Sequence, residues 1–346
     1  QELVEATTGS ALDPAWERQW SNDPVIERAV AAMLDREDAG GAGAFLRQQQ
    51  AAHGPFRIAG YSGIGYEPAP VASYPERRWE PGVLAILVNG RTMRLGLYDM
   101  QGYNPLQLRL YTDYLAALNS RPQNYHHANL LPGGFHSPLL DLLNVRYLLV
   151  DARIPADRAD VAALRDGRQE VFRNDEVVIY ENWEALPHAW VVHDVRSATP
   201  PAALALLASG QANPRWTAFV EGRPPPLAPA TGTPVETAFI TSYEADSLRV
   251  EVNATGAGLL VLSEVWAEGW QAAVNGVPAP ILRTDGALRG VPIQAGHHTV
   301  ELWYAPRSLQ LGLLISGVAT VAMLASFAAA AVSWTNGRGA RAEGRE

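Results

Sequence analysis

The sequence predicts an α+β fold with three parts: a mixed α/β domain, then an antiparallel β-sandwich, then one transmembrane helix. Three observations predict this fold. Helical and strand-like segments alternate up to about residue 185. Short strand-like runs separated by hairpin turn pairs occupy residues 186–306. An uncharged apolar stretch runs from Leu309 to Trp334. We therefore expect domains at 1–185 and 186–306, a membrane helix at 307–335 and a tail at 336–346.

Composition limits the possible classes of protein. A soluble part of roughly 300 residues is longer than one typical domain, and 47 % hydrophobic residues suffice for a real core. The 25 prolines and 30 glycines favour loops and strands over a helical bundle. A net charge of −9 argues against nucleic acid as a partner, because phosphate binding needs a basic surface. Without cysteine there is no disulfide, thiolate metal site or thiol nucleophile.

The N-terminal domain is predicted from changes in hydrophobic period. Apolar residues at helical spacing follow two Asp-Pro pairs within residues 1–52, where Asp is a favoured N-cap and Pro a favoured first residue. Residues 61–82 are rich in Gly, Pro and Tyr and indicate an ordered loop. Further helices are expected at Leu106–Leu118 and Leu139–Leu143, and strands at Phe56–Ala59, Val83–Val88, Arg146–Val150 and Val177–Tyr180.

The second domain shows strand-like runs at regular spacing. Asn275-Gly276 and Asp285-Gly286 are pairs typical of two-residue hairpin turns. Many short strands with such turns indicate an antiparallel β-sandwich. One helix is expected at Ala202–Ser209, and strands at 189–193, 216–220, 236–243, 247–253, 258–264, 270–274, 280–283, 288–293 and 298–304.

The stretch from Leu309 to Trp334 is long enough to cross a bilayer. As a helix it would extend about 39 Å, against a hydrocarbon core of roughly 30 Å. Trp303, Tyr304 and Trp334 flank it, as expected of aromatic residues at the membrane interface. Three arginines in the tail predict that residues 336–346 are cytoplasmic and residues 1–306 lie on the extracytoplasmic side.

The chain begins with Gln1 and shows no signal-peptide pattern. Since a domain outside the membrane needs a route there, we expect either the C-terminal piece of a longer polytopic protein or a processed chain.

Motifs for catalysis are weak. Gly60-Tyr61-Ser62-Gly63-Ile64 lacks the final glycine of a nucleophile elbow and the helix that should follow it. His126, His127 and His136 share one loop, but their spacing matches no established metal site, and we interpret them as polar loop residues. The residues therefore predict no catalytic group, no metal and no cofactor in this chain.

Two tryptophans next to carboxylates are the candidate binding residues. Glu264 and Glu268 flank Trp266, and Trp270 follows. An aromatic ring suits the apolar face of a sugar, and a carboxylate can accept its hydroxyl hydrogen bonds. The alternative is that one tryptophan belongs to the sandwich core and the other covers it. Trp266, Trp270 and Arg289 are the predicted glycan contacts.

Several segments resemble the YfhO family of bacterial membrane proteins, with matching order and spacing over roughly residues 55–320. Within them, His188 stands where Arg is common in the family, and Glu264 where Asp is common. The segments are Tyr98 to Tyr111, Leu142 to Leu149, Glu181 to Ala189, Leu260 to Gly276, Arg289 to Val300 and Tyr304 to Ser308.

The resemblance implies a relation to C-type glycosyltransferases, which take sugars from polyprenyl-phosphate carriers at the outer face of the membrane. The implied function is the extracytoplasmic C-terminal region of such a membrane protein, acting in modification of cell-envelope glycans. The catalytic acid of such enzymes lies in an early loop outside this chain, so this chain alone is not expected to be catalytic. Expected partners are membrane lipid, polyprenyl-phosphate sugar, envelope glycan and the N-terminal membrane helices of the parent protein. One alternative is a non-catalytic, membrane-anchored glycan-binding or scaffold module; a tethered hydrolase is the third reading.

Overall fold

The computed structural model describes residues 41–63, 81–88, 90–104, 106–123, 127–226 and 236–342, with side chains up to residue 328. The helices expected before residue 41, most of the loop expected at 61–82 and His126 lie outside the described residues. Helices and strands alternate up to Glu181, and mainly antiparallel strands follow, so the predicted α+β class is confirmed.

A five-stranded mixed sheet organises the N-terminal part, in the order β2-β1-β5-β7-β6. β1 pairs in parallel with β2 and β5, whereas β7 pairs antiparallel with β5 and β6. β5 and β7 are nearly continuous apolar runs and are buried over almost their whole length, as expected for central strands covered on both faces. The strands are β1 (Arg57–Tyr61), β2 (Tyr98–Asp99), β5 (Val145–Asp151), β6 (Gln169–Arg173) and β7 (Val177–Glu181).

Helices cover both faces of this sheet. α4 packs Leu46 against the face that carries Tyr147, while α8 and α9 pack on the face that carries Leu148. Ser137 begins α9, where its side chain accepts a hydrogen bond from the Leu139 N–H. The remaining elements are α4 (Ala42–His53), α6 (Pro81–Ala85), α7 (Arg91–Arg94), β3 (Gly102–Tyr103), α8 (Arg109–Leu118), β4 (His127–Ala128), a 3₁₀ turn (Pro132–Gly134), α9 (Pro138–Leu142) and α10 (Ala159–Arg165).

The strand predicted at Val83–Val88 is wrong, because residues Pro81–Ala85 form helix α6 and the chain then turns. Residues 83 to 88 are all buried, so the run is apolar on every side. A short continuous apolar run of this kind has no period that separates a strand from a helix. Pro81, at the first helical position, is the local signal that favours the helix.

Two stacked sheets form the C-terminal part. One has the order β8-β13-β17-β16-β10-β9 and the other β11-β12-β18-β14-β15. The pairs are antiparallel except β9 with β10, which run parallel. The strands are β8 (Ala189–Val192), β9 (Asp194–Ser197), β10 (Thr217–Val220), β11 (Thr237–Tyr243), β12 (Ser247–Ala254), β13 (Gly258–Val265), β14 (Trp270–Val274), β15 (Val277–Ala279), β16 (Leu282–Thr284), β17 (Leu288–Ile293) and β18 (Gly296–Tyr304), and helix α11 is Pro200–Ala208.

Both predicted hairpin turns are present. Asn275 and Gly276 have φ of 51° and 77°, and Asp285 and Gly286 have φ of 50° and 83°. Positive φ at both central residues is what the tight turn between twisted antiparallel strands requires. Burial alternates along β12 because successive side chains of a strand point to opposite faces. Leu248, Val250 and Val252 face the other sheet of the sandwich.

The N-terminal part and the sandwich share one apolar cluster. Leu115 of α8, Leu139 of α9 and Leu148 of β5 belong to the same buried cluster as Val261 of β13 and Leu288 of β17. A second cluster fills the space between the two sheets of the sandwich. The helices α8 and α9 therefore attach the mixed sheet to the sandwich through a continuous core.

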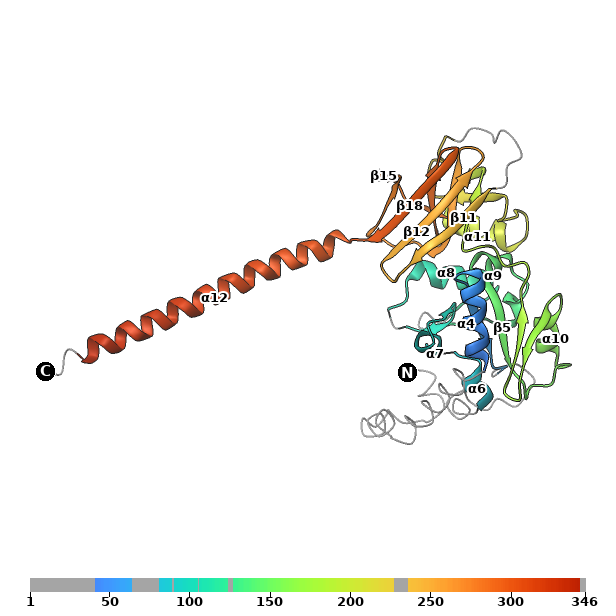
Figure 1. The fold of residues 1–346 in the computed structure, drawn as a ribbon, viewed down its shortest axis with the longest axis horizontal. Helices are drawn as coiled ribbons and strands as arrows, with labels where there is room; N and C mark the ends of the chain where they lie inside the picture. The colour runs from blue at the N-terminus through green and yellow to red at the C-terminus, as the bar shows by residue number, and fades with distance from the viewer. Residues whose placement is uncertain are drawn as a thin grey trace.

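A single long helix, α12 (Arg307–Ala342), leaves the body directly after β18 and extends away from it (Figure 1). Its segment Arg307–Ala328 is long and apolar enough to cross a membrane, and none of it is buried in the molecule. At about 1.5 Å per residue, that segment extends roughly 33 Å, which matches a hydrocarbon core of about 30 Å. The apolar surface therefore has no cover within the described structure and suits lipid.

Candidate functional site

Glu264 lies at the junction between the mixed sheet and the sandwich, near the C-terminal end of β13. The pairing of β13 with β17 is irregular between Leu262 and Val265, which places Glu264 in a bulge. Its Oε1 accepts hydrogen bonds from Arg57 Nη2 at 2.7 Å, His188 Nε2 at 2.7 Å and Tyr243 Oη at 2.6 Å. Three strands, β1, β11 and β13, and the loop before β8 therefore meet at one carboxylate oxygen.

Arg57 completes this contact from the first strand of the mixed sheet. Its Nη1 donates to the carbonyl oxygens of Leu143 at 3.1 Å and Ser263 at 2.6 Å. The Ser263 hydroxyl in turn donates to the carbonyl oxygen of Leu142 at 2.7 Å. The side chains of Arg57 and Glu264 are only 12 % and 17 % exposed, so this is a mostly buried ion pair whose second amino group on Arg57 is hydrogen-bonded to carbonyl oxygens.

The ion pair sets the protonation of the cluster. Burial alone would raise the pKa of Glu264, but the Arg57 charge and the hydrogen bonds from His188 and Tyr243 outweigh it and hold that pKa far below its usual range. Burial, with the Glu264 charge second, raises the pKa of Tyr243. Glu264 is therefore permanently ionised and Tyr243 neutral near pH 7, which suits a structural role better than acid–base catalysis.

His188 is mostly buried and contacts this carboxylate. Burial lowers its pKa, although the hydrogen bond to Glu264 opposes the shift. A neutral ring with the proton on Nε2 donates to Glu264, so Nδ1, which lies 3.3 Å from Asn144 Oδ1, has no proton to donate to that oxygen. Asn144 itself donates to the carbonyl oxygen of Leu186 at 2.6 Å.

A cavity of about 350 Å³ opens on one side of Glu264, and we call it the basal cavity. Its volume lies within the range of roughly 300–1,000 Å³ that is usual for ligand sites. Its lining comes from the mixed sheet and from both sheets of the sandwich: Tyr98, Tyr243, Glu244, Ala245, Leu248, Glu264, Trp270 and Arg289.

The basal cavity contains two of the three predicted glycan contacts. The Arg289 guanidinium carbon lies 3.7 Å from the centre of the Trp270 ring, a close cation–π contact. The Trp270 ring also packs against Tyr304, with ring centres 5.6 Å apart. Trp266 is not part of the lining. The structure thus brings Trp270 and Arg289 together and leaves Trp266 apart; their role in glycan contact stays a prediction.

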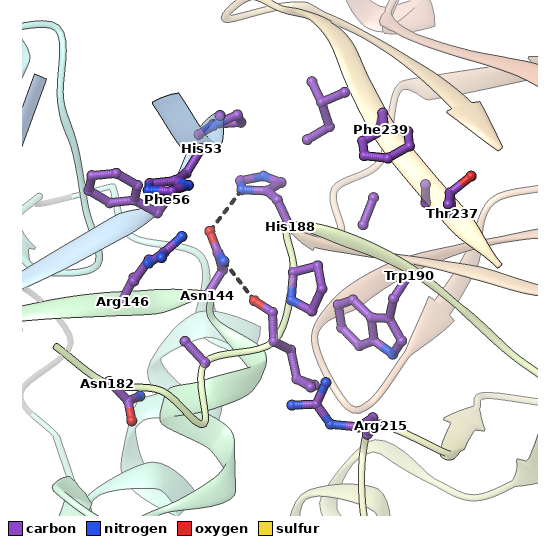
Figure 2. Close-up of a pocket in the computed structure, with 18 of the residues that line it drawn as sticks. His53, Phe56, Asn144, Arg146, Asn182, His188, Trp190, Arg215, Thr237 and Phe239 are labelled. Atoms are coloured by element: carbon purple, nitrogen blue, oxygen red, sulfur yellow. Dashed lines mark hydrogen bonds between the residues drawn. The ribbon is translucent and has the colours of Figure 1, made fainter. Parts of the chain in front are cut away.

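A larger cavity of about 890 Å³ lies between the mixed sheet and the sandwich, and we call it the interdomain groove. Figure 2 shows His53, Phe56 and Arg146 on one side and Thr237 and Phe239 of β11 on the other, with His188 between them. His188 therefore lines this groove, while its hydrogen-bond partner Glu264 lines the basal cavity.

Large aromatic side chains in the groove wall are exposed to solvent. Trp183 is 60 % exposed, Trp216 68 % and Phe239 64 %. Single exposed aromatic residues are ordinary, but several in one concave wall mark a binding surface. Two other groove residues, Arg215 and His53, make no side-chain hydrogen bond or ion pair with the described residues.

Strand β11 contributes residues to the lining of both cavities. Its first half, Thr237 to Ile240, lines the groove, and its last residue, Tyr243, lines the basal cavity. At about 3.4 Å per residue, these ends are roughly 20 Å apart. Tyr243 pairs with Leu248, and the neighbouring Ser247 pairs with Trp303 near the start of α12. The basal cavity is therefore on the side of the membrane helix and the groove farther from it.

Within the described part of the chain, no group of three His, Asp or Glu residues could hold a metal ion. Burial raises the pKa of Asp99 to about 8 and that of Asp285 to about 7. Neither residue lines the groove or the basal cavity.

Residues 235–316 match the family model described as bacterial membrane protein YfhO. This part of the chain is similar to the YfhO family. The match covers β11 to β18 and the start of α12, which include Glu264, Trp270 and Arg289. The family and the apolar helix together support membrane association. No curated protein and no solved structure matches the chain.

The YfhO-like segments noted in the sequence come together at the Glu264 cluster. Asn144, His188, Glu264 and Arg289 come from four different segments; His188 is hydrogen-bonded to Glu264, and its Nδ1 lies 3.3 Å from Asn144 Oδ1. Sequence reasoning missed Arg57, which supplies the charge that balances Glu264. It also missed Trp183 and Trp216, because no local pattern separates an exposed tryptophan from a core one.

Proposed function

We propose that this chain is the extracytoplasmic region of a glycosyltransferase-like membrane protein that uses polyprenyl-phosphate-linked sugars to modify envelope glycans. In this proposal the chain does not carry the catalytic groups. Its part is to hold the acceptor glycan, and the interdomain groove is the place where it does so. The match of residues 235–316 to the YfhO family model supports the membrane setting of the proposal.

The observation that carries the proposal is the set of exposed aromatic side chains in the groove, Trp183, Trp216 and Phe239. Indole and phenyl faces suit the apolar C–H faces of sugar rings, and neighbouring polar groups fix the orientation of the ring hydroxyls. Thr237 and Arg215 supply such polar groups in the same groove. A polymer needs a groove that spans several residues, and this one is the larger of the two cavities.

The charge of the groove favours a neutral sugar chain. Arg146 pairs with Glu181 at 2.9 Å, so these two charges cancel, and the carboxylate of Glu236 adds a negative charge to the lining. Among the lining residues that the structure describes, Arg215 is the one arginine without a side-chain partner. Strongly anionic polymers would meet too little compensating charge.

The test uses the full chain in detergent micelles and neutral wall polysaccharide from the source bacterium, with retardation in a native gel cast with that polysaccharide as the measurement. We expect wild-type protein to be retarded and Trp183→Ala and Trp216→Ala to lose at least about tenfold in apparent affinity, equivalent to about 1.4 kcal/mol. Trp303→Ala is the matched control, because Trp303 is 37 % exposed and outside the groove. Equal retardation of the groove variants and wild type would contradict the proposal.

The alternative is a non-catalytic glycan-binding or scaffold module, and it predicts the same binding result. The whole parent protein separates the two. If the chain serves a transferase, Trp216→Ala in the parent protein lowers sugar incorporation into the envelope. If it is a scaffold module, incorporation is unchanged while binding is lost.

A further inference from the structure

Arg289 is a buried cation whose terminal amino groups are unused. The residue is 4 % exposed, and its Nε–H donates to the carbonyl oxygen of Val265 at 3.0 Å. Its guanidinium lies over the Trp270 ring. No described residue pairs with Nη1 or Nη2 by a hydrogen bond or ion pair. Burying a guanidinium without such partners is costly, so this arrangement is typical of a site that receives an anion.

The surrounding charges leave that positive charge uncompensated. Glu264 lines the same cavity, but its charge is balanced by Arg57 at 2.7 Å. His188 is neutral in this setting, as burial lowers its pKa. Burial also lowers the pKa of Arg289, to about 10, so the group is still a cation near pH 7. Glu244 is exposed at the rim, where water screens it.

The position of the cavity indicates what kind of anion is near. Trp270 pairs with Tyr304, whose N–H donates to the carbonyl oxygen of Asp246 at 2.8 Å. α12 begins at Arg307, three residues after Tyr304, which is at most about 11 Å of chain. Trp303 and Tyr304 are 37 % and 45 % exposed, as expected for aromatic side chains at lipid headgroups. Figure 1 shows α12 leaving this end of the sandwich.

We propose that the basal cavity binds the phosphate group of a membrane phospholipid, with Arg289 as its ligand and Trp270 as the ring that holds the guanidinium in place. A planar guanidinium with two free amino groups donates two parallel hydrogen bonds to one phosphate. Such binding fixes the body against the bilayer at a second point besides α12. This proposal is independent of glycan binding in the groove.

The test titrates the full chain in dodecyl maltoside micelles with dihexanoyl-phosphatidylglycerol, measured by isothermal calorimetry. We expect saturable binding to one site, and a loss of at least about tenfold in affinity for Arg289→Gln. Arg283→Gln is the matched control, because Arg283 lies on neighbouring β16, pairs with Glu221 and is outside the cavity. Equal affinity of Arg289→Gln and wild type overturns the proposal.

A second variant keeps the proposal testable if Arg289→Gln unfolds. Ala245 is exposed and lines the cavity, so Ala245→Trp blocks the cavity while Arg289 is retained. We expect this variant to fold and to lose binding as well; a folded variant that binds as wild type does contradicts the proposal.

Two further ligands distinguish the source of the phosphate. Dihexanoylglycerol, which lacks phosphate, should not bind, and inorganic phosphate should bind at least about tenfold more weakly than the lipid, because it makes no apolar contact. Binding of dihexanoylglycerol as tight as that of the lipid shows an apolar site and overturns the proposal. Inorganic phosphate binding as tightly as the lipid shows a site for a soluble anion and also overturns it.

Discussion

Replacing Glu264 by glutamine removes the charge that balances Arg57 without changing the shape of the side chain. The two side chains are 12 % and 17 % exposed and in contact at 2.7 Å. Breaking a buried ion pair by removing one partner costs about 3–5 kcal/mol of unfolding free energy. Arg57 keeps its hydrogen bonds to the carbonyl oxygens of Leu143 and Ser263. We therefore expect the lower end of that range, about 3 kcal/mol.

The assay is urea unfolding of the full chain in micelles at pH 7, followed by circular dichroism. Glu301→Gln is the matched control, because it breaks the exposed Arg249–Glu301 pair, which should contribute less than about 1 kcal/mol. The double variant Arg57→Gln/Glu264→Gln removes both charges of the pair, so its loss of stability should be smaller than the sum of the two single losses. If Glu264→Gln costs no more than Glu301→Gln, the reasoning on this cluster is refuted.

The same cluster predicts a pH dependence. The pKa of Glu264 is lowered in the folded state, so its stabilising contribution is fully present above the unfolded-state pKa near 4.5 and is lost as the pH falls below it. The stability difference between wild type and Glu264→Gln should therefore be constant above about pH 5.5 and shrink at lower pH. A difference that grows on acidification would contradict the lowered pKa.

Three further substitutions test other parts of the fold. Burial raises the pKa of Asp285 to about 7, so its contribution to stability is present below the unfolded-state pKa near 3.8 and is lost as the pH rises to about 7. At about 1.4 kcal/mol per pKa unit, Asp285→Asn should gain about 4 kcal/mol relative to wild type between pH 4 and pH 8 in melting experiments, and a pH-independent difference would speak against this. Gly290→Ala would place a Cβ 2.3 Å from Thr284 Oγ1 and should cost about 1–3 kcal/mol in urea unfolding, whereas an unchanged midpoint would show that β16 can move aside. Ser263→Ala leaves the buried carbonyl oxygen of Leu142 without its hydrogen-bond donor and should lower the unfolding free energy by about 1–3 kcal/mol in the same assay. A loss below about 0.5 kcal/mol would show that this hydrogen bond contributes little.

The sequence was sufficient to predict elements whose local pattern and tertiary setting agree. The turns at Asn275-Gly276 and Asp285-Gly286 need positive φ, and their residue types favour it. β5 and β7 were recognisable as apolar runs between polar segments. The helix α12 was evident because no soluble core would need so long an uncharged run.

Other elements depend on tertiary contacts that a local pattern does not contain. Residues 83–88 are buried on every side, so their period was uninformative and α6 was mistaken for a strand. β6 alternates poorly, with exposed and half-buried residues at the sheet edge, and was not predicted. β9 is short and largely exposed, and it was missed for the same reason.

The candidate site was predicted in part. Trp270 and Arg289 were named from the sequence and lie together in the basal cavity. Arg57 reaches Glu264 across 207 positions of sequence, and no spacing rule predicts such a pair. Trp183 and Trp216 line one groove only because the two parts of the folded chain form its walls, and the sequence does not show this.

The central claim is that α12 crosses the membrane and holds the body of the chain on the outer side. The chain has no cysteine, so single cysteines can report sidedness. Asn213 is exposed on the body, and Gly339 lies in the segment expected to be cytoplasmic. In intact cells that express the whole protein, a membrane-impermeant maleimide should label Asn213→Cys at once and Gly339→Cys only after permeabilisation. Labelling of Gly339→Cys but not Asn213→Cys in intact cells, or equal labelling of both, would contradict the account.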